Sequence, residues 1–189
     1  MDIHEEKKGL RKAVRAKLEA LSAIDKACAA RQVMEKLSQL DQWKRADIVF
    51  AFVSMPDEID TIPILRTALE AGKKVVLPKV AGENLIFYEI SNLEQDIAPG
   101  AFGILEPVPG LRQVRPEDLT GLSCVVLVPG VAFDRENFRL GRGKGFYDRF
   151  FASVGNSVYK VGIGYSFQLV EEVPRESHDQ KLDAVIIGQ

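Results

Sequence analysis

The segment ADIVFAFV, residues 46–53, is an almost continuous run of apolar residues. Such a run is typical of a strand that is covered on both faces, because a strand with one wet face alternates apolar and polar residues. The segment SCVVLV, residues 123–128, has the same character and is followed by Pro129-Gly130. With helical patterns between them, these segments predict an α/β fold whose central sheet is mostly parallel and has helices on both faces.

Outward from these strands, helical and extended patterns alternate along the chain. Leu10, Val14 and Leu18 recur every four residues, which predicts an amphipathic helix. We expect helices over residues 5–20, 23–39, 145–153 and 167–173, and one from about Asp60 to a stop at Gly72. We expect strands over residues 46–53, 74–77, 85–90, 123–128, 159–163 and 182–187. Pro78 should end the strand at 74–77, and residues 91–120 should form loops with one short helix.

The bulk composition is that of an ordinary globular protein. The chain has 189 residues, of which 46% are hydrophobic and 28% are charged, so we expect a single domain over residues 1–189. The formal net charge is -2, which gives no reason to expect binding to nucleic acid or to a membrane. We expect small molecules as partners, and a monomer.

Cellular location follows from three further features. Cys28 and Cys124 are expected to be reduced core residues. The N-terminal stretch MDIHEEKKGLRK is charged and contains no apolar signal-peptide region. No apolar stretch approaches the roughly 20 residues that a membrane-spanning helix needs. The expected location is therefore the cytoplasm.

The first candidate site is the glycine-rich stretch RLGRGKGFYD, residues 139–148. Glycines at alternate positions let consecutive main-chain amides surround an anion, and the helix that follows points its N-terminus at the same place. Arg139, Arg142 and Lys144 add positive charge, which suits a polyphosphate. The spacing is not that of a Walker A motif. The alternative interpretation is a flexible basic surface loop.

Two further segments carry candidate binding residues. Lys7, Lys8, Arg11 and Arg15 share one helix face, which is either a solvated face or a phosphate-binding one; no aromatic residues interleave with them, which disfavours nucleic acid. In SMPDEID, residues 54–60, Glu58 follows a strand and can accept paired hydrogen bonds from a planar edge such as that of a pterin. The alternative is a helix N-cap cluster, which fits Asp60 better than Glu58.

Asp148 and Asp179 are candidate ligands for Mg²⁺, which prefers one or two carboxylates together with phosphate oxygens and water. Asp148 follows the glycine-rich stretch directly. By spacing alone, Asp179 equally fits a surface turn. His4 and His178 have no metal-ligand spacing and are expected at the surface.

In this order, the blocks resemble the 5-formyltetrahydrofolate cyclo-ligase family, also called 5,10-methenyltetrahydrofolate synthetases. The most specific part is PGVAFD at 129–134 followed by residues 139–148. Supporting blocks are KKGLR at 7–11, SMPDEI at 54–59, GILEP at 103–107 and PRESHD at 174–179. One glycine-rich loop is weak evidence, whereas five ordered blocks that span nearly the whole chain are specific.

The resemblance implies ATP-dependent conversion of 5-formyltetrahydrofolate to 5,10-methenyltetrahydrofolate, with release of ADP and phosphate. It implies a single three-layer α/β/α domain like those of sugar-phosphate isomerases and CoA transferases. In family terms, the residues that bind ATP are Lys7, Lys8, Gly9, Leu10 and Arg11, with Arg139, Leu140, Gly141, Arg142, Gly143, Lys144, Gly145, Phe146 and Tyr147. Those that contact the folate are Val53, Met55 and Glu58, with Arg142, Gly143, Lys144, Gly145 and Phe146. Asp148 and Asp179 hold Mg²⁺.

Three residues are expected to act on the reacting groups. Arg142 and Lys144 would offset charge on the transferring phosphoryl group. Tyr147 would pack on the pterin or orient a phosphate; alternatively, it anchors its helix in the core. Phe102 is a candidate for stacking on the pterin, against plain packing.

Three other functions remain as alternatives at this point. The chain would then be a relative that binds ATP or folate without catalysis, an isomerase- or CoA-transferase-like enzyme on a similar sheet, or an RNA-binding protein that uses its N-terminal helix.

Overall fold

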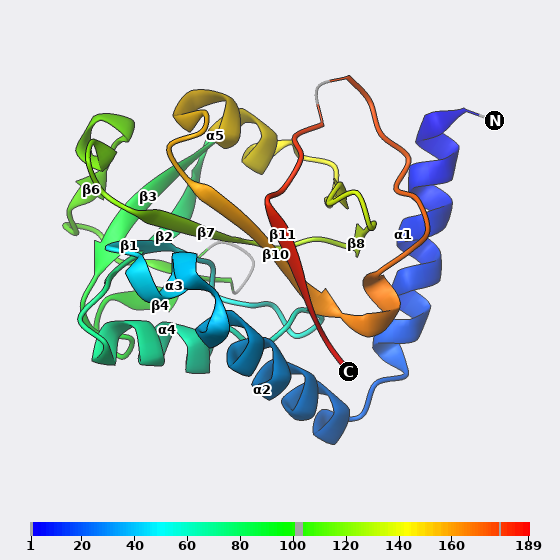
Figure 1. The fold of residues 1–189 in the computed structure, drawn as a ribbon, viewed down its shortest axis with the longest axis horizontal. Coiled ribbons are helices and arrows are strands. Elements are labelled where there is room, and N and C mark those ends of the chain that lie inside the picture. The colour runs from blue at the N-terminus through cyan, green and yellow to red at the C-terminus, as the bar shows by residue number, and fades with distance from the viewer. Residues whose placement is uncertain (1, 101–103, 178) are drawn as a thin grey trace.

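A computed structural model describes residues 2–100, 104–177 and 179–189. Its central sheet has seven strands in the order β11-β10-β7-β1-β2-β3-β6 (Figure 1). Their bounds are β1 Ile48–Phe50, β2 Lys74–Ala81, β3 Asn84–Ile90, β6 Gln113–Val114, β7 Cys124–Val128, β10 Tyr159–Tyr165 and β11 Ala184–Gly188. The strands from β11 to β2 pair in parallel, and β3 and β6 add an antiparallel edge. The predicted mostly parallel sheet is confirmed.

Helices cover both faces of this sheet. They are α1 Ile3–Glu19, α2 Ala23–Gln39, α3 Asp41–Arg45, α4 Ile62–Glu70 and α5 Phe146–Val154. Alternate strand residues face two separate apolar cores: Val49 belongs to the core to which α1, α2 and α4 contribute, whereas Phe50 belongs to the core that contains Phe151 of α5. Figure 1 shows α2 and α4 on one side of the sheet and α5 on the other. The three-layer α/β/α arrangement is therefore confirmed.

Local signals fixed several helix ends as expected. Ser22 and Asp25 form a capping box at the start of α2, with each side chain bonded to the other's main-chain amide. Pro63 lies in the first turn of α4, and Gly72, with φ of 73°, follows its end. Cys124 is buried in β7, Cys28 is half-buried on α2, and both thiols are free. Along the described residues, no helix is both long and apolar enough to cross a bilayer.

Pro78 does not end its strand, so that prediction was wrong. β2 continues to Ala81, and Pro78 lies opposite Phe87 of β3. β1 pairs with β2 only as far as Val76, so Pro78 has no β1 neighbour in the ladder to which an N–H would donate. A proline is tolerated at such a place.

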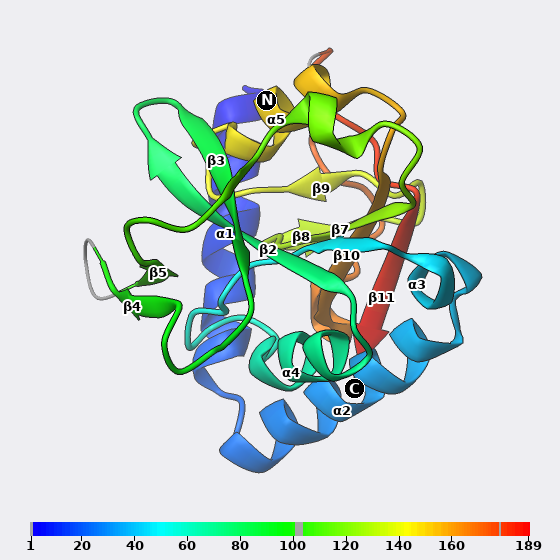
Figure 2. The same cartoon turned by 90° about the vertical axis from the view of Figure 1, so that its left-hand side faces the viewer.

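Other boundaries also differ from the prediction. The ladder of β1 covers three residues rather than 46–53, although Ala51 and Phe52 remain buried. Residues 91–120 contain the expected short helix, η2 Pro116–Leu119, but also β6 and a two-stranded sheet of β4 Ile97–Pro99 and β5 Leu105–Pro107 (Figure 2). These strands are too short to show a periodic pattern, and the five-residue α3 was missed for the same reason.

The helix expected over 167–173 is reduced to one turn, η3 Ser166–Gln168. Beyond it, Leu169 bridges to Phe133, and the Val170 amide donates to the Phe133 carbonyl at 2.8 Å. This extended pairing joins the segment to a second two-stranded sheet, β8 Ala132–Phe133 and β9 Arg139–Leu140. A long-range pairing therefore replaces the local helical preference.

Close packing of β11 on α2 gives a test of the fold. A Cβ atom at Gly188 would collide with the main-chain carbonyl of Ala29, which cannot rotate away. We expect Gly188→Ala to lower the free energy of unfolding by about 1–3 kcal/mol, measured by urea denaturation. The control is Gly9→Ala within α1, where a Cβ atom meets open space. This substitution should raise the free energy of unfolding by at most about 1 kcal/mol, because alanine favours the helix more than glycine does. Equal stability of the two variants would contradict the packing described.

Candidate functional site

A cavity of about 540 Å³ lies beyond the carboxyl ends of the parallel strands, where ligands of such sheets bind. Pro129 and Gly130 follow β7, and Met55 and Glu58 lie in the segment after β1. The other lining residues come from α1, from β9 and α5 with the stretch between them, and from the C-terminal segment: His4, Lys7, Arg11, Arg139 to Arg149, Glu176 and Asp179. The structure thus brings together residues as far apart in the sequence as Lys7 and Asp179, which are separated by 172 positions.

The glycine-rich stretch forms one wall of this cavity. Gly143 and Gly145 have φ values of 97° and 66°, which residues with a side chain rarely adopt. Gly145 is the N-cap of α5, and no side chain among the described residues caps that end of the helix. The first amides of α5 therefore remain available to an anion in the cavity.

Arg139 is the buried cation of the site, with a side chain only 6% exposed. Its Nη2 donates to Asp148 Oδ1 at 3.0 Å, and its guanidinium lies 5.6 Å from the centre of the Tyr147 ring. Its Nε is buried and has no hydrogen-bond partner in the part of the chain that the structure describes. A buried donor without a partner is costly, so a bound acceptor in the cavity would stabilise it.

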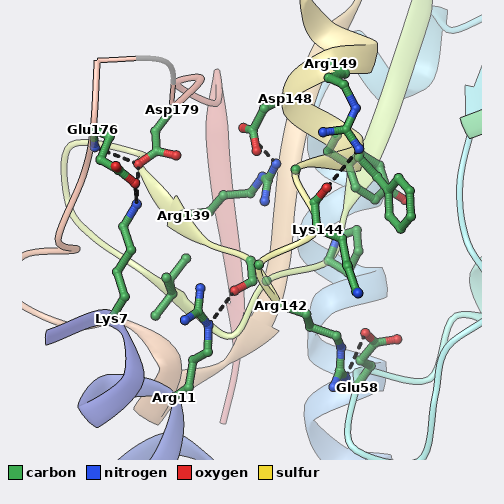
Figure 3. Close-up of a pocket in the computed structure, with 18 of the residues that line it drawn as sticks. Lys7, Arg11, Glu58, Arg139, Arg142, Lys144, Asp148, Arg149, Glu176 and Asp179 are labelled. Carbon is green, nitrogen blue, oxygen red and sulfur yellow. Dashed lines mark hydrogen bonds and ion pairs between the residues drawn. The ribbon is translucent and has the colours of Figure 1, made fainter. Parts of the chain in front are cut away.

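Helix α1 brings two cations to the same wall (Figure 3). Arg11 Nε donates to the Gly141 carbonyl at 3.0 Å. Lys7 Nζ pairs with Glu176 at 2.8 Å and with Asp179 at 2.9 Å. Burial by itself lowers the pKa of Lys7, but these two carboxylates outweigh it and leave the pKa above its usual value. Lys7 therefore stays charged.

Glu58 and Arg142 meet at the opposite side of the cavity. Glu58 Oε2 accepts from the Met55 amide at 2.9 Å, and Oε1 accepts from Arg142 Nη2 at 3.2 Å. Arg142 also donates to both carboxylate oxygens of Asp57, at 2.8 and 3.0 Å. Burial raises the pKa of Glu58, although the Met55 amide and Arg142 oppose the shift. The hydroxyl of Tyr165 fixes the main chain here by donating to the Glu58 carbonyl at 2.9 Å.

Tyr147 contacts both the cavity and the core. Its ring lies 5.9 Å from that of Phe151, which packs in the core beneath α5. Burial, with a smaller contribution from Glu58, raises the pKa of its phenol. The phenol is therefore neutral at physiological pH and can donate a hydrogen bond. Both interpretations of Tyr147 remain compatible with this position.

Buried polar side chains hold the loops of the site in place. Asp134 accepts from the Phe138 amide at 2.9 Å and from the Val173 amide at 3.1 Å, which joins the β8–β9 turn to the C-terminal segment. Gln168 donates to the carbonyls of Gly130 at 2.9 Å and Val131 at 3.0 Å. These contacts fix the segments that carry Arg139 and Asp179.

Asp148 and Asp179, the candidate metal ligands, both line the cavity. Within residues 2–100, 104–177 and 179–189, no cluster of three or more His, Cys, Asp or Glu side chains is arranged to hold a metal. Mg²⁺ held between protein and phosphates needs only one or two carboxylates. The donor set therefore suits a metal that arrives with a nucleotide rather than one held by protein alone.

Several predicted residues lie elsewhere. Lys8 is 72% exposed and pairs with Glu5 at 3.5 Å, and it does not line the cavity. Gly9, Leu10 and Val53 do not line it either; Leu10 and Val53 pack against the larger core. Phe102 and His178 lie outside the described residues.

The sequence interpretation missed Asp57, Tyr165 and Arg149. Asp57 and Tyr165 hold Arg142 and Glu58, and Arg149 lines the cavity. Arg149 directly follows the glycine-rich stretch, which was the one available signal. Asp57 and Tyr165 contact partners that are 85 and 107 positions away in the chain.

Comparisons with known proteins agree on one family. The model of the 5-formyltetrahydrofolate cyclo-ligase family matches residues 3–188. The 5-formyltetrahydrofolate cyclo-ligase of Escherichia coli K12 is 36% identical over 145 residues, which cover 75% of this chain and 78% of that protein. The solved structure of Aquifex aeolicus 5,10-methenyltetrahydrofolate synthetase aligns with a TM-score of 0.81 and 37% identity, covering 96% of this chain and 89% of that one.

A second solved structure is similar over almost the full length. The 5,10-methenyltetrahydrofolate synthetase of Mycoplasma pneumoniae aligns with a TM-score of 0.75 and 25% identity, covering 98% of each chain. These names favour the cyclo-ligase interpretation over an isomerase- or CoA-transferase-like enzyme.

The raised pKa of Glu58 makes a prediction about stability. Because its pKa is higher in the folded than in the unfolded state, protonation favours folding; this contribution is present below the unfolded pKa and is lost as pH rises through the folded pKa. Glu58→Gln removes the ionisable group and keeps an oxygen that can accept from Met55. We expect the variant to melt at a higher temperature than the wild type at about pH 8, with the difference vanishing near about pH 4.

The matched control is Glu117→Gln, because the Glu117 side chain is 68% exposed. It should melt like the wild type at both pH values. A Glu58→Gln variant that is less stable than the wild type at about pH 8 would show that the Arg142 contact outweighs the cost of burial.

Proposed function

Because the chain belongs to the 5-formyltetrahydrofolate cyclo-ligase family, we propose that it uses ATP to convert 5-formyltetrahydrofolate to 5,10-methenyltetrahydrofolate and releases ADP and phosphate. The observation that carries this proposal is the buried Arg139, whose Nε lacks a partner among the described residues at the wall of a cavity that the glycine-rich stretch also lines. The cytoplasmic location and monomeric state expected from the sequence stay predictions.

The triphosphate is assigned to the side of the cavity formed by Arg139, the glycine-rich stretch and α1. Arg11 supports this assignment because it lines the cavity and holds the Gly141 carbonyl. Free amides at the start of α5 and the positive-φ glycines suit the non-bridging oxygens of phosphates. Lys7 lies on the same side, next to Asp179, one of the two carboxylates that would hold a metal.

The pterin is assigned to the opposite side, at Met55 and Glu58. A buried carboxylate can accept two parallel hydrogen bonds from the N–H and amino groups of a pterin edge. Arg142 donates a hydrogen bond to one oxygen of Glu58 in this structure. Arg142 also bonds Asp57, so it keeps an acidic partner when a folate takes over both oxygens of Glu58. The formyl group would then lie between the two sides, near Lys144 and Tyr147.

The proposed reaction has two chemical steps. The formyl oxygen attacks the γ-phosphorus of ATP, the bond to the β-phosphate oxygen breaks, and ADP leaves. The product of this step is an imidate phosphate on N5. N10 then attacks the former formyl carbon and loses its proton, and phosphate departs with the original formyl oxygen. The methenyl bridge between N5 and N10 remains.

The protein's contribution is positioning and charge stabilisation. Arg142 and Lys144 offset negative charge on the phosphoryl group as it moves between oxygens. The main-chain amides of the glycine-rich stretch hold its equatorial oxygens. The neutral phenol of Tyr147 can donate to a phosphate or to the pterin, as its raised pKa allows.

Mg²⁺ is the metal that this donor set fits, and Asp148 and Asp179 would hold it together with phosphate oxygens. When bound, it would neutralise part of the charge on the triphosphate. Asp148 also neutralises Arg139, so the cation and the metal would share one carboxylate.

Turnover is tested by mixing the protein with Mg-ATP and 5-formyltetrahydrofolate and following the methenyl chromophore. We expect Lys144→Ala and Arg142→Ala each to lower kcat by about 100- to 1,000-fold, because each removes a charge from the phosphoryl group in the transition state. Circular dichroism should show an unchanged fold, since both side chains lie at the protein surface. Arg112→Ala, an exposed arginine on the far edge of the sheet, is the control and should keep full turnover.

Near-normal turnover in both loop variants would refute the role given to the glycine-rich stretch. A wild-type protein that binds ATP without forming the chromophore would instead identify a non-catalytic relative.

Metal dependence is a separate test. Treatment with a chelator should abolish turnover, and added Mg²⁺ should restore it. Without the metal, no divalent cation held by the two carboxylates would offset the negative charge of the triphosphate. Asp179→Asn should raise the Mg²⁺ concentration needed for half-maximal turnover. Full activity in the presence of the chelator would contradict the metal assignment.

A further inference from the structure

Arg149 is a cavity residue to which the proposed chemistry gives no task. It lies in the first turn of α5, directly after Asp148, and lines the cavity. Its side chain is extended over the glycine-rich stretch, and its guanidinium lies 5.5 Å from the centre of the Phe146 ring. Figure 3 shows it pointing at the main chain of Lys144 and not at an acidic side chain.

The guanidinium joins two main-chain carbonyls. Its Nη2 donates to the Lys144 carbonyl at 2.8 Å. Its Nε donates to the Glu83 carbonyl at 2.7 Å, and Nη2 also bonds that oxygen. Arginine suits this task because its planar fork presents several donors in fixed directions, which a lysine ammonium does not.

The two partners belong to different parts of the fold. Glu83 lies in the turn between β2 and β3, the hairpin at the antiparallel edge of the sheet. That hairpin packs on α5, where the rings of Phe87 and Phe150 are 4.5 Å apart. Arg149 thus ties the exposed residues 142–144 of the glycine-rich stretch to a hairpin that core contacts already hold in place.

Two arginines consequently hold the main chain of the glycine-rich stretch, one at Gly141 and the other at Lys144. Arg11 bonds the Gly141 carbonyl from α1, and Arg149 bonds the Lys144 carbonyl from α5. The peptide group between Lys144 and Gly145 is planar, so fixing its carbonyl also fixes the direction of the Gly145 amide. In Figure 3 the Lys144 ammonium extends away from Arg149, on the side of the site where Arg142 and Glu58 lie.

We propose that Arg149 is a positioning residue, which sets the direction of the Lys144 side chain and of the Gly145 amide by latching the glycine-rich stretch to the β2–β3 turn. This inference rests on the proposed function, because it assumes that these groups act on the phosphoryl group. Arg149 acts through the main chain of Lys144, and it does not itself contact the reacting atoms.

The test compares three variants in the methenyl assay. Arg149→Met keeps most of the length of the side chain and removes all donors, and Arg149→Lys keeps the charge without the fork. Glu83→Ala is the matched control, because Arg149 uses the main-chain carbonyl of Glu83 and not its carboxylate. We expect Arg149→Met to lower kcat by about 10- to 100-fold, since a misplacement of about 1 Å in catalytic groups has effects of this size.

The changes in kcat, KM and melting temperature distinguish a positioning role of Arg149 from a general loss of structure. The KM for 5-formyltetrahydrofolate should change much less than kcat, because the contacts assigned to the pterin at Glu58 and Met55 are untouched. Arg149→Lys should be impaired in kcat nearly as much as Arg149→Met, and Glu83→Ala should equal the wild type. The melting temperature of every variant should match that of the wild type.

Three results would contradict the positioning role of Arg149. The first is a wild-type kcat in Arg149→Met, and the second is a wild-type kcat in Arg149→Lys. The third is a rise in the KM values for both ATP and 5-formyltetrahydrofolate together with a lower melting temperature. If the wild type forms no methenyl product, the proposed function fails. The positioning role of Arg149 is then tested separately, by calorimetric titration of the variants with ATP. In that case Arg149→Met must weaken ATP binding several-fold relative to Glu83→Ala, and equal affinities would overturn it.

Discussion

The burial of the Arg139 guanidinium is the constraint on which the rest of the site depends. Removing such a group from water is costly unless its donors find acceptors. Asp148 meets part of this requirement through Nη2, and Nε lacks a partner among the described residues. A site built in this way is incomplete until a ligand with acceptor oxygens enters. Phosphate oxygens meet the requirement and match the positive charge that Arg11, Arg142 and Lys144 bring to the same cavity.

The fold explains how so many cations come to one cavity. Parallel strands place the loops after β1 and β7 at one edge of the sheet. Helix α1 then packs along this edge, so that Lys7 meets the C-terminal segment and Arg11 meets the glycine-rich stretch. Among the described residues, the carboxylates that line the cavity are each tied to a cation: Asp148 to Arg139, Glu176 and Asp179 to Lys7, and Glu58 to Arg142. Repulsion of a polyphosphate is thereby reduced.

The sequence predicted those features that depend on local patterns. The apolar runs at 46–53 and 123–128 identified two central strands, and Ser22 with Asp25 marked the start of α2, as the structure confirms. Pro78 was misjudged because the effect of a proline depends on which neighbouring strand needs its N–H. The contacts of Asp57, Tyr165 and Arg149 were beyond prediction, since each joins residues more than 60 positions apart. No periodicity in the chain records such contacts.

The most direct measurement is a crystal structure of the protein with Mg²⁺ and a non-hydrolysable ATP analogue. We expect the γ-phosphate to lie within hydrogen-bonding distance of Arg139 Nε or of the amides at the start of α5, with Lys144 directed at it. A triphosphate bound elsewhere, with residues 139–148 facing bulk solvent and Arg139 Nε still unpartnered, would contradict the account.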